Sequence, residues 1–201
     1  MRSKFLLINF MISSLWFLAM QVNAQGGTLP LNGSVNGTLA SSTTTDTWDL
    51  TTTGDGLVRL TFHSTGASAA DMLVAIYDNN GTTLLGGPLE SYSNSTVNLP
   101  VDGLAAGTYH VKITPYNTGS VVGTYTLSDS LFTPTQPNDV EPNNSRATAL
   151  TLSVNSSATG HVGYYYNNYR DTADWYKVTT NADGLLKVNL STAHSSTYST
   201  N

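Results

Sequence analysis

Short runs in which apolar and polar residues alternate recur along this chain, and they limit its fold more than any other feature does. In residues 57–63, the side chains of Val58, Leu60 and Phe62 lie on one face of an extended chain, and polar side chains lie on the other. Residues 108–114 repeat this alternation. After the N-terminal segment, no window of about 11 residues has the period of a helix. The sequence therefore predicts an all-β protein built as an antiparallel, jelly-roll-like β-sandwich.

The composition excludes several classes of site and partner. Charged residues make up 10% of the chain, against about 25% in an ordinary soluble domain. The chain contains no Cys, which excludes disulfides and thiolate metal sites. It has 13 acidic and 8 basic residues, and its formal net charge is −5. Because phosphate binding needs clustered Lys and Arg, we predict no nucleic-acid partner.

Residues 1–24 have the pattern of a secretory signal peptide. Two basic residues stand near the start, an apolar stretch covers residues 5–20, and compact side chains follow at Val22 and Ala24. Cleavage is expected before Gln25. The apolar stretch is shorter than the about 20 residues that cross a membrane. We therefore predict a secreted or cell-surface protein with no transmembrane segment after cleavage.

Turn residues and prolines divide the remaining chain into two blocks. We expect a first β-sandwich module over residues 25–130. Pro134 and Pro137 cannot donate to a sheet ladder, so residues 131–138 are interpreted as a linker. A second block then occupies residues 139–201.

The second block repeats the start of the first. Trp48 precedes the run Asp-Gly-Leu-Val-Arg-Leu at 55–60, and Trp175 precedes Asp-Gly-Leu-Leu-Lys-Val at 183–188. Self-similarity over two such segments favours duplication of one module, with both tryptophans in equivalent core positions. The second copy is shorter than the first. We therefore expect an incomplete module that does not fold alone, in a chain that is a fragment or ends early.

Several motifs together resemble a known family. They are Asp-Met-Leu-Val-Ala-Ile-Tyr-Asp at 71–78, Ala-Gly-Thr-Tyr at 106–109, Gly-Thr-Tyr-Thr-Leu at 123–127, Glu-Pro-Asn-Asn at 141–144 and Asp-Thr-Ala-Asp-Trp at 171–175. The chain resembles the bacterial pre-peptidase C-terminal domain over about residues 30–130 and 139–191. This resemblance implies tandem β-sandwich modules of the kind appended to secreted peptidases and other exported proteins. It also implies a relation to the collagen-binding modules of secreted bacterial collagenases.

Oxygen-bearing side chains at the start of the second block predict a calcium site. Calcium binds six to eight oxygens from carboxylates, amides and carbonyls at flexible geometry. The family resemblance supports calcium, because collagen-binding members hold it through a similar opening segment and an Asp-x-x-Asp pair. The predicted ligands are Glu141, Asn143, Asn144, Asp171 and Asp174. The first block lacks the Glu-Pro-Asn-Asn motif, and we predict no site there.

A group of aromatic residues in the second block gives a candidate ligand-binding surface. Exposed aromatic rings stack on sugars or pack on extended peptides. The residues are Tyr164, Tyr165, Tyr166 and Tyr169. The alternative is that they fill half-buried positions of a sheet, where aromatic residues are favoured. An extracellular polysaccharide or protein polymer is the expected partner.

The sequence gives little support to catalysis. Its His residues lack the His-Glu-x-x-His spacing, and no Gly-x-Ser-x-Gly elbow is present. We therefore expect a non-catalytic accessory or binding module of a secreted bacterial protein, with a calcium-stabilised linker. Two alternatives stay open. The chain could be the N-terminal fragment of a secreted peptidase or other hydrolase whose catalytic domain lies outside it, or a structural repeat of a surface adhesin or stalk.

Overall fold

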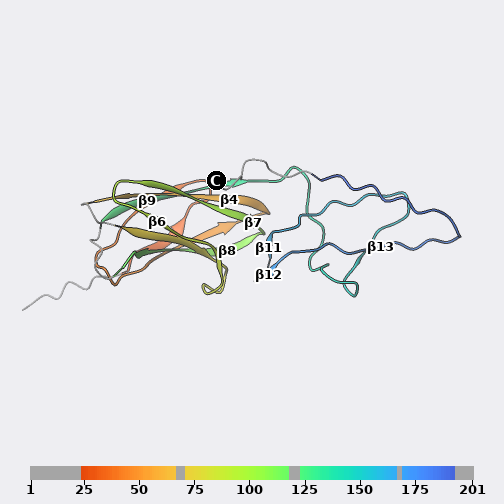
Figure 1. Ribbon diagram of the computed structural model, residues 1–201, viewed down its shortest axis with the longest axis horizontal. Coiled ribbons are helices and arrows are strands. Elements are labelled where there is room, and N and C mark those ends of the chain that lie inside the picture. The colour runs from red at the N-terminus through yellow and green to blue at the C-terminus, as the bar shows by residue number, and fades with distance from the viewer. Residues whose placement is uncertain (1–23, 67–70, 118–122, 167–168, 193–201) are drawn as a thin grey trace, which may run out of the picture.

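A computed structural model describes residues 24–66, 71–117, 123–166 and 169–192 (Figure 1). The predicted signal peptide lies outside the described residues except for Ala24. The described residues form strands and no helix, so they contain no helix that could cross a membrane. The strands of the first block are β1 (Gly26–Leu29), β2 (Ser34–Thr38), β3 (Asp46–Thr52), β4 (Gly56–Thr65), β5 (Met72–Tyr77), β6 (Leu84–Ser91), β7 (Thr96–Leu104), β8 (Gly107–Pro115) and β9 (Thr124–Phe132). Those of the second block are β10 (Leu150–Thr151), β11 (Tyr165–Tyr166), β12 (Tyr169–Arg170) and β13 (Tyr176–Lys177).

The first nine strands form a β-sandwich, which confirms the predicted fold class. One sheet has the order β1-β3-β8-β5-β6. The other has the order β7-β4-β9-β2 and is extended by β11 and β12 beyond β7. The pairs within the sandwich are antiparallel except β1 with β3, which are parallel because the intervening β2 crosses to the other sheet. Strand β9 runs to Phe132, two residues into the segment that the sequence assigned to a linker.

The core of the sandwich lies between the two sheets, where each strand turns its apolar side chains inward. The pattern is complete in β4, whose residues alternate between buried and partly exposed along the whole strand. The predicted inward faces at 57–63 and 108–114 are thus confirmed. The buried side chains are Leu29, Leu39, Trp48, Leu50, Val58, Leu60, Phe62, Met72, Val74, Ile76, Leu99, Leu104, Tyr109, Val111, Ile113, Tyr125 and Leu127.

A chain of polar contacts crosses this core at one end. The Trp48 indole Nε1 donates to the Tyr125 hydroxyl at 2.8 Å. That hydroxyl donates to Oδ2 of Asp46 at 2.7 Å. Asp46 is 1% exposed, so its carboxylate depends on these internal donors. The chain links β3 of one sheet to β9 of the other and fixes how the two sheets face each other.

The second block extends away from one end of the sandwich and has little regular structure (Figure 1). Strands β10 and β13 form a short parallel pair, and β11 and β12 form a short hairpin. The repeat segment at 183–188 forms no strand, and Leu185 is fully exposed. Trp175 is 45% exposed, so its predicted core position is wrong. The repeat motif lacks, among the described residues, the neighbouring strands that bury its counterpart β4.

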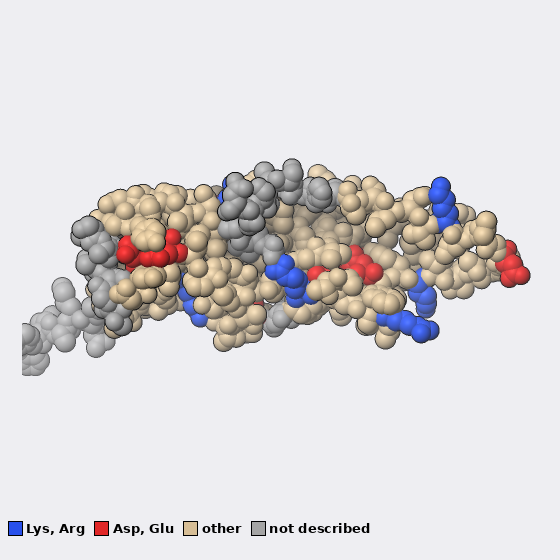
Figure 2. All heavy atoms as spheres, viewed as in Figure 1, with Lys and Arg blue, Asp and Glu red and all other residues tan. Residues whose placement is uncertain are grey.

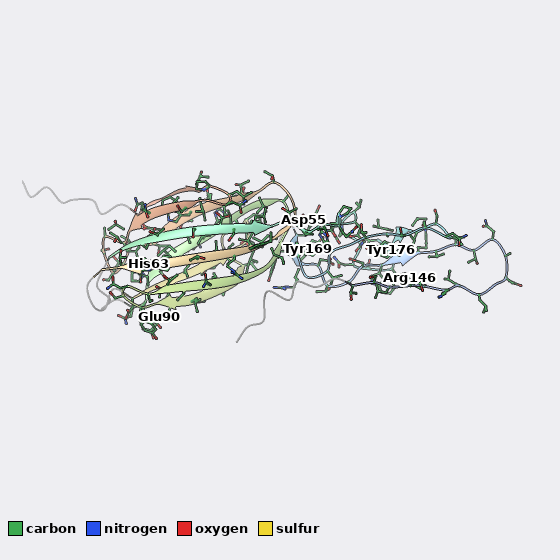
Figure 3. The ribbon with its side chains drawn as sticks, turned by 90° about the horizontal axis from the view of Figure 1, so that it is seen from above. Asp55, His63, Glu90, Arg146, Tyr169 and Tyr176 are labelled. Carbon is green, nitrogen blue, oxygen red and sulfur yellow. The ribbon has the colours of Figure 1, made fainter. Side chains whose placement is uncertain are left out.

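Three contacts attach the second block to the sandwich where β7 ends. The Ala105 N–H donates to the Tyr165 carbonyl at 2.9 Å and continues the sheet into β11. The Tyr164 ring lies directly over Gly103, where a Cβ would stand 2.4 Å from ring atoms. Nδ1 of His161 lies 3.6 Å from Oδ2 of Asp55, which marks this end of the sandwich in Figure 3. The second block therefore docks on the first at a defined position.

The polar chain gives a test of the sandwich. Replacing Tyr125 by Phe keeps the ring and its contact with Phe62, but leaves the Trp48 Nε1 and Oδ2 of Asp46 without their partner. Each unpaired buried group costs about 1–3 kcal/mol, so we expect Tyr125→Phe to lower the free energy of unfolding by about 2–4 kcal/mol. Urea unfolding measures this loss. Tyr116→Phe, at a 49% exposed tyrosine, is the matched control, and equal effects of the two substitutions would contradict the prediction.

The contact between the Tyr164 ring and Gly103 gives a test of how the second block docks on the sandwich. In Gly103→Ala the new methyl group collides with the Tyr164 ring, so the ring must leave its position and the β7–β11 junction must open. We expect faster hydrogen exchange at Ala105, whose N–H bonds to Tyr165. Gly54→Ala is the control, because nothing lies within 4 Å of a Cβ at Gly54. Unchanged exchange at Ala105 in Gly103→Ala would show that this contact does not fix the position of the second block on the sandwich.

Candidate functional site

Two loops of the second block meet at a group of acidic and amide side chains. The Trp175 N–H donates to the Asn143 carbonyl at 3.1 Å and holds the loops together. The side chain of Asn144 adds to this, because its Oδ1 accepts from the N–H groups of Thr172 and Ala173 at 3.4 and 3.3 Å. Five side chains that each have an unpaired buried oxygen lie near one another, and we call them the acidic cluster: Asp139, Glu141, Asn143, Asp171 and Asp174.

The acidic cluster brings negative charges unusually close together for a chain with so few of them. One carboxylate oxygen each from Asp139, Glu141 and Asp174 lies within 4.8 Å of the others. Figure 2 shows Asp and Glu side chains gathered near the middle of the elongated molecule. Asn143 and Asp171 are 0% and 1% exposed, so this part of the cluster is shielded from water. Such an arrangement stabilises a cation and repels itself without one.

Each member of the cluster has a buried oxygen without a hydrogen-bond partner. These atoms are Oδ1 of Asp139, Oε1 of Glu141, Oδ1 of Asn143, Oδ2 of Asp171 and Oδ1 of Asp174. Buried polar atoms in folded proteins are almost always paired, so five unpaired oxygens in one place require an explanation. A bound cation supplies one, because carboxylate oxygens of Asp139, Glu141 and Asp174 lie close enough together to share one ion, with Asn143 and Asp171 beside them.

The other polar atoms of the same side chains are held by the protein. Nδ2 of Asn143 donates to Oδ2 of Asp139 at 2.6 Å, and the Tyr176 hydroxyl donates to the same oxygen. Oε2 of Glu141 accepts from the Asn143 N–H at 3.1 Å. Oδ1 of Asp171 accepts from the Ala173 N–H at 3.3 Å. These partners orient the side chains before any ligand binds.

The electrostatics of the cluster agree with this geometry. Burial, together with the nearby carboxylates of Asp139 and Asp171, raises the pKa of Asp174 to about 6. Burial is also the main cause that raises the pKa of Glu141 and that of Asp171, and neighbouring carboxylates add to both. The negative charges thus disfavour one another in the cluster.

Gly160 makes room for the cluster. A Cβ at this position would lie 2.5 Å from Oδ2 of Asp174 and 3.1 Å from Oδ1 of Asp139. A side chain here would therefore displace two of the carboxylates. Glycine is required at this position by close approach rather than by its backbone angles.

The structure brings together four of the five predicted ligands. Glu141, Asn143, Asp171 and Asp174 each have a buried oxygen without a hydrogen-bond partner, and carboxylate oxygens of Glu141 and Asp174 lie within 4.8 Å of each other. Asn144 instead positions the loop that carries Asp171, because its oxygen is occupied by backbone donors. Sequence reasoning missed Asp139. Its spacing of two from Glu141 was the available signal, since residues i and i+2 of an extended chain point to the same side.

The four predicted aromatic residues have separate surroundings. Tyr164 packs on Gly103 and stacks on the His161 ring at 4.9 Å. Tyr165 lies against the sandwich core and under the guanidinium of Arg170. The rings of Tyr166 and Tyr169 lie 6.1 Å apart in a tilted pair, with Tyr169 labelled in Figure 3.

Comparison with known sequences identifies no relative, since no protein-family model and no curated protein matches the chain. Three solved structures that are similar to this chain each cover about half of it. A pre-peptidase C-terminal domain of a collagenase from Bacillus anthracis matches with a TM-score of 0.39 and 16% identity, over 53% of this chain and 96% of that one. It belongs to the family that the sequence motifs resemble.

Two further solved structures are similar at the same level. A periplasmic inhibitor of g-type lysozyme from Aeromonas hydrophila has a TM-score of 0.36 and 14% identity, over 55% of this chain and 100% of that one. A β-glucosidase from Paenibacillus barengoltzii has a TM-score of 0.29 and 14% identity, over 53% of this chain and 11% of that one.

Proposed function

We propose that this chain is a non-catalytic accessory region of an exported bacterial protein, and that its acidic cluster binds a calcium ion. The observation that carries the proposal is the set of five buried oxygens without partners. Four belong to carboxylates and one to an amide, which are the oxygen types that calcium prefers.

The choice of calcium follows from the donor set. The five side chains supply oxygen and no nitrogen or sulfur, which favours a hard cation over zinc or copper. Magnesium demands near-ideal octahedral geometry and keeps several waters, whereas calcium accepts six to eight ligands at flexible angles. The five oxygens come from two separate segments of the chain, and such an irregular set suits calcium better than magnesium.

Calcium would stiffen the connection between the two blocks. Asp139, Glu141 and Asn143 follow directly after the predicted linker, whereas Asp171 and Asp174 lie in a loop after the β11–β12 hairpin. An ion shared by both segments would tie the start of the second block to the hairpin that docks on the sandwich. The role of the ion is then mechanical, and it would hold a neighbouring module at a fixed angle.

Export and polymer binding complete the proposed function. The N-terminal sequence has the pattern of a secretory signal. The proposed partner is an extracellular polysaccharide or protein polymer, and Tyr166, which is half-buried and lies beside the Tyr169 ring, is the residue that would contact it.

Calorimetry of residues 25–201 with calcium tests the metal site. We expect saturable binding, and we expect Asp174→Asn to weaken it by about tenfold or more, because affinity follows the charge of the ligands. Asp183→Asn removes an exposed carboxylate of the same block and should leave binding unchanged. Without calcium, Asp174→Asn should raise thermal stability, since it relieves repulsion in the cluster.

A second variant tests the geometry of the site without changing its charge. Gly160→Ala alters no ligand but displaces two carboxylates, so it should also weaken calcium binding. The exposed Gly184 has no atom within 4 Å of a Cβ, which makes Gly184→Ala its control. No heat at millimolar calcium in the parent chain would refute the proposal.

Cosedimentation with insoluble collagen, chitin and cellulose tests the partner. We expect one of these polymers to retain the chain, and we expect Tyr166→Ala to lower the retained fraction at least about threefold, since stacked rings supply about 0.5–1.5 kcal/mol beyond area burial. Tyr92→Ala removes a 62% exposed tyrosine of the sandwich and serves as the control. Equal loss in both variants, or no retention by any of the three, would count against this partner class.

A further inference from the structure

The backbone of Gln25 is anchored in the sandwich by its nitrogen. The Gln25 N–H donates to Oδ1 of Asp46 at 2.6 Å. The Gln25 carbonyl accepts from the Thr47 N–H at 3.0 Å. The Gln25 side chain reaches the other sheet, where its Oε1 accepts from the Thr38 N–H at 2.8 Å. This residue is therefore fixed on both sheets immediately before β1 begins.

The acceptor of this contact is a buried carboxylate without a cationic side chain. Asp46 is 1% exposed, and its second oxygen accepts from the Tyr125 hydroxyl. In the described part of the chain, the ion pairs are His110 with Asp49 and His161 with Asp55, and neither involves Asp46. A buried carboxylate is costly unless a positive charge or several donors compensate it.

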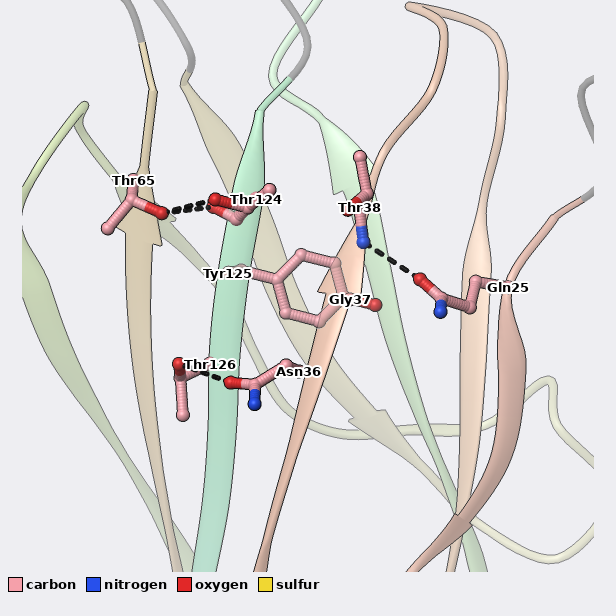
Figure 4. Close-up of a pocket in the computed structure, with 8 residues that line it drawn as sticks. All are labelled: Gln25, Asn36, Gly37, Thr38, Thr65, Thr124, Tyr125 and Thr126. Atoms are coloured by element: carbon pink, nitrogen blue, oxygen red, sulfur yellow. Dashed lines mark hydrogen bonds between the residues drawn. The ribbon is translucent and has the colours of Figure 1, made fainter.

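The described residues that line the hollow beside Gln25 include no other charged side chain. A hollow of about 340 Å³ beside Gln25 is lined by Asn36, Gly37, Thr38, Thr65, Thr124, Tyr125 and Thr126. Figure 4 shows these side chains with Gln25 at one side. Tyr125 is the only titratable group among them, and burial raises its pKa. Among the described residues, the charged side chain that contacts the Gln25 nitrogen is thus Asp46.

The predicted cleavage point coincides with this contact. The signal pattern places the scissile bond between Ala24 and Gln25, and both residues are exposed. Before cleavage, the Gln25 nitrogen is a neutral amide. Hydrolysis of the bond by a signal peptidase adds water, leaves a carboxylate on Ala24 and frees an α-amino group on Gln25. That amine takes up a proton at neutral pH.

We propose that processing at the Ala24–Gln25 bond creates a structural ion pair, in which the new α-ammonium of Gln25 neutralises the buried Asp46 carboxylate. The hydrogen bond that already exists becomes charge-assisted, and such bonds are about twice as strong as neutral ones. Asp46 is in this sense a binding site for the mature N-terminus. The inference is independent of the calcium site, which lies in the other block.

The ion pair predicts how stability depends on pH. Asp46 favours the charged form of the α-amino group, so the pKa of this group is higher in the folded protein than in the unfolded chain. Its contribution to stability is fully present below the ordinary α-amino pKa of about 8 and is lost as pH rises through the higher folded value. Between pH 7 and pH 10, the mature protein should therefore lose the stability that the ion pair contributes. The precursor lacks the ion pair and should show no such loss.

Two forms of the chain that differ only at the N-terminus test this proposal. One is residues 25–201 with Gln25 first, confirmed by mass spectrometry to be uncyclised. The other carries one added Gly before Gln25, which turns the nitrogen into an amide and moves the amine into solvent. We expect the unfolding equilibrium constant of the first to rise about tenfold more than that of the second between pH 7 and pH 10. Asp46→Asn in both forms should abolish the difference.

The comparison of the two N-termini needs no substitution at Asp46, so it holds even if Asp46→Asn fails to fold. Equal pH profiles of the two forms would overturn the proposal. Sequencing of the N-terminus after export of the precursor gives the second readout. Gln25 as the first residue is expected, and a different first residue would also overturn it.

Discussion

The apolar layer between the two sheets is the constraint on which the other features depend. It is filled from both sides by strands that bury every second residue, and this fixes where each strand ends. The end of β7 matters most, because Gly103 and Ala105 there receive Tyr164 and Tyr165 of the second block. The position of the acidic cluster thus depends on the apolar core, although no cluster residue belongs to that core.

In the core, apolar side chains attract one another, whereas in the acidic cluster the rest of the protein holds together groups that repel one another. Backbone and side-chain donors hold one carboxylate oxygen of Asp139, Glu141 and Asp171, and the Asn143 amide donates to Asp139, while one oxygen of each of these side chains stays unpaired. This arrangement costs stability in the absence of a ligand, as the raised pKa of Asp174 indicates. Folding energy from elsewhere in the chain offsets that cost, which is how binding sites generally differ from cores.

Sequence reasoning succeeded where a local pattern decides the outcome. The period of two in the strands set which residues of β4 and β8 are buried. It failed where an outcome depends on distant neighbours. Trp175 was expected in a core, but the described residues supply no second sheet to cover it. Asp139 was missed beside the predicted linker, and the role of Asn144 depends on a loop 28 and 29 residues away.

The position of β2 has a consequence for the order in which the chain becomes ordered. Strand β2 is paired only with β9, and the side chains of Asn36 and Thr126 that join them are 90 residues apart. When the chain leaves a ribosome, β2 emerges long before β9. Contacts between residues so distant in sequence form slowly. The sandwich therefore cannot close until nearly all of its first block has been synthesised.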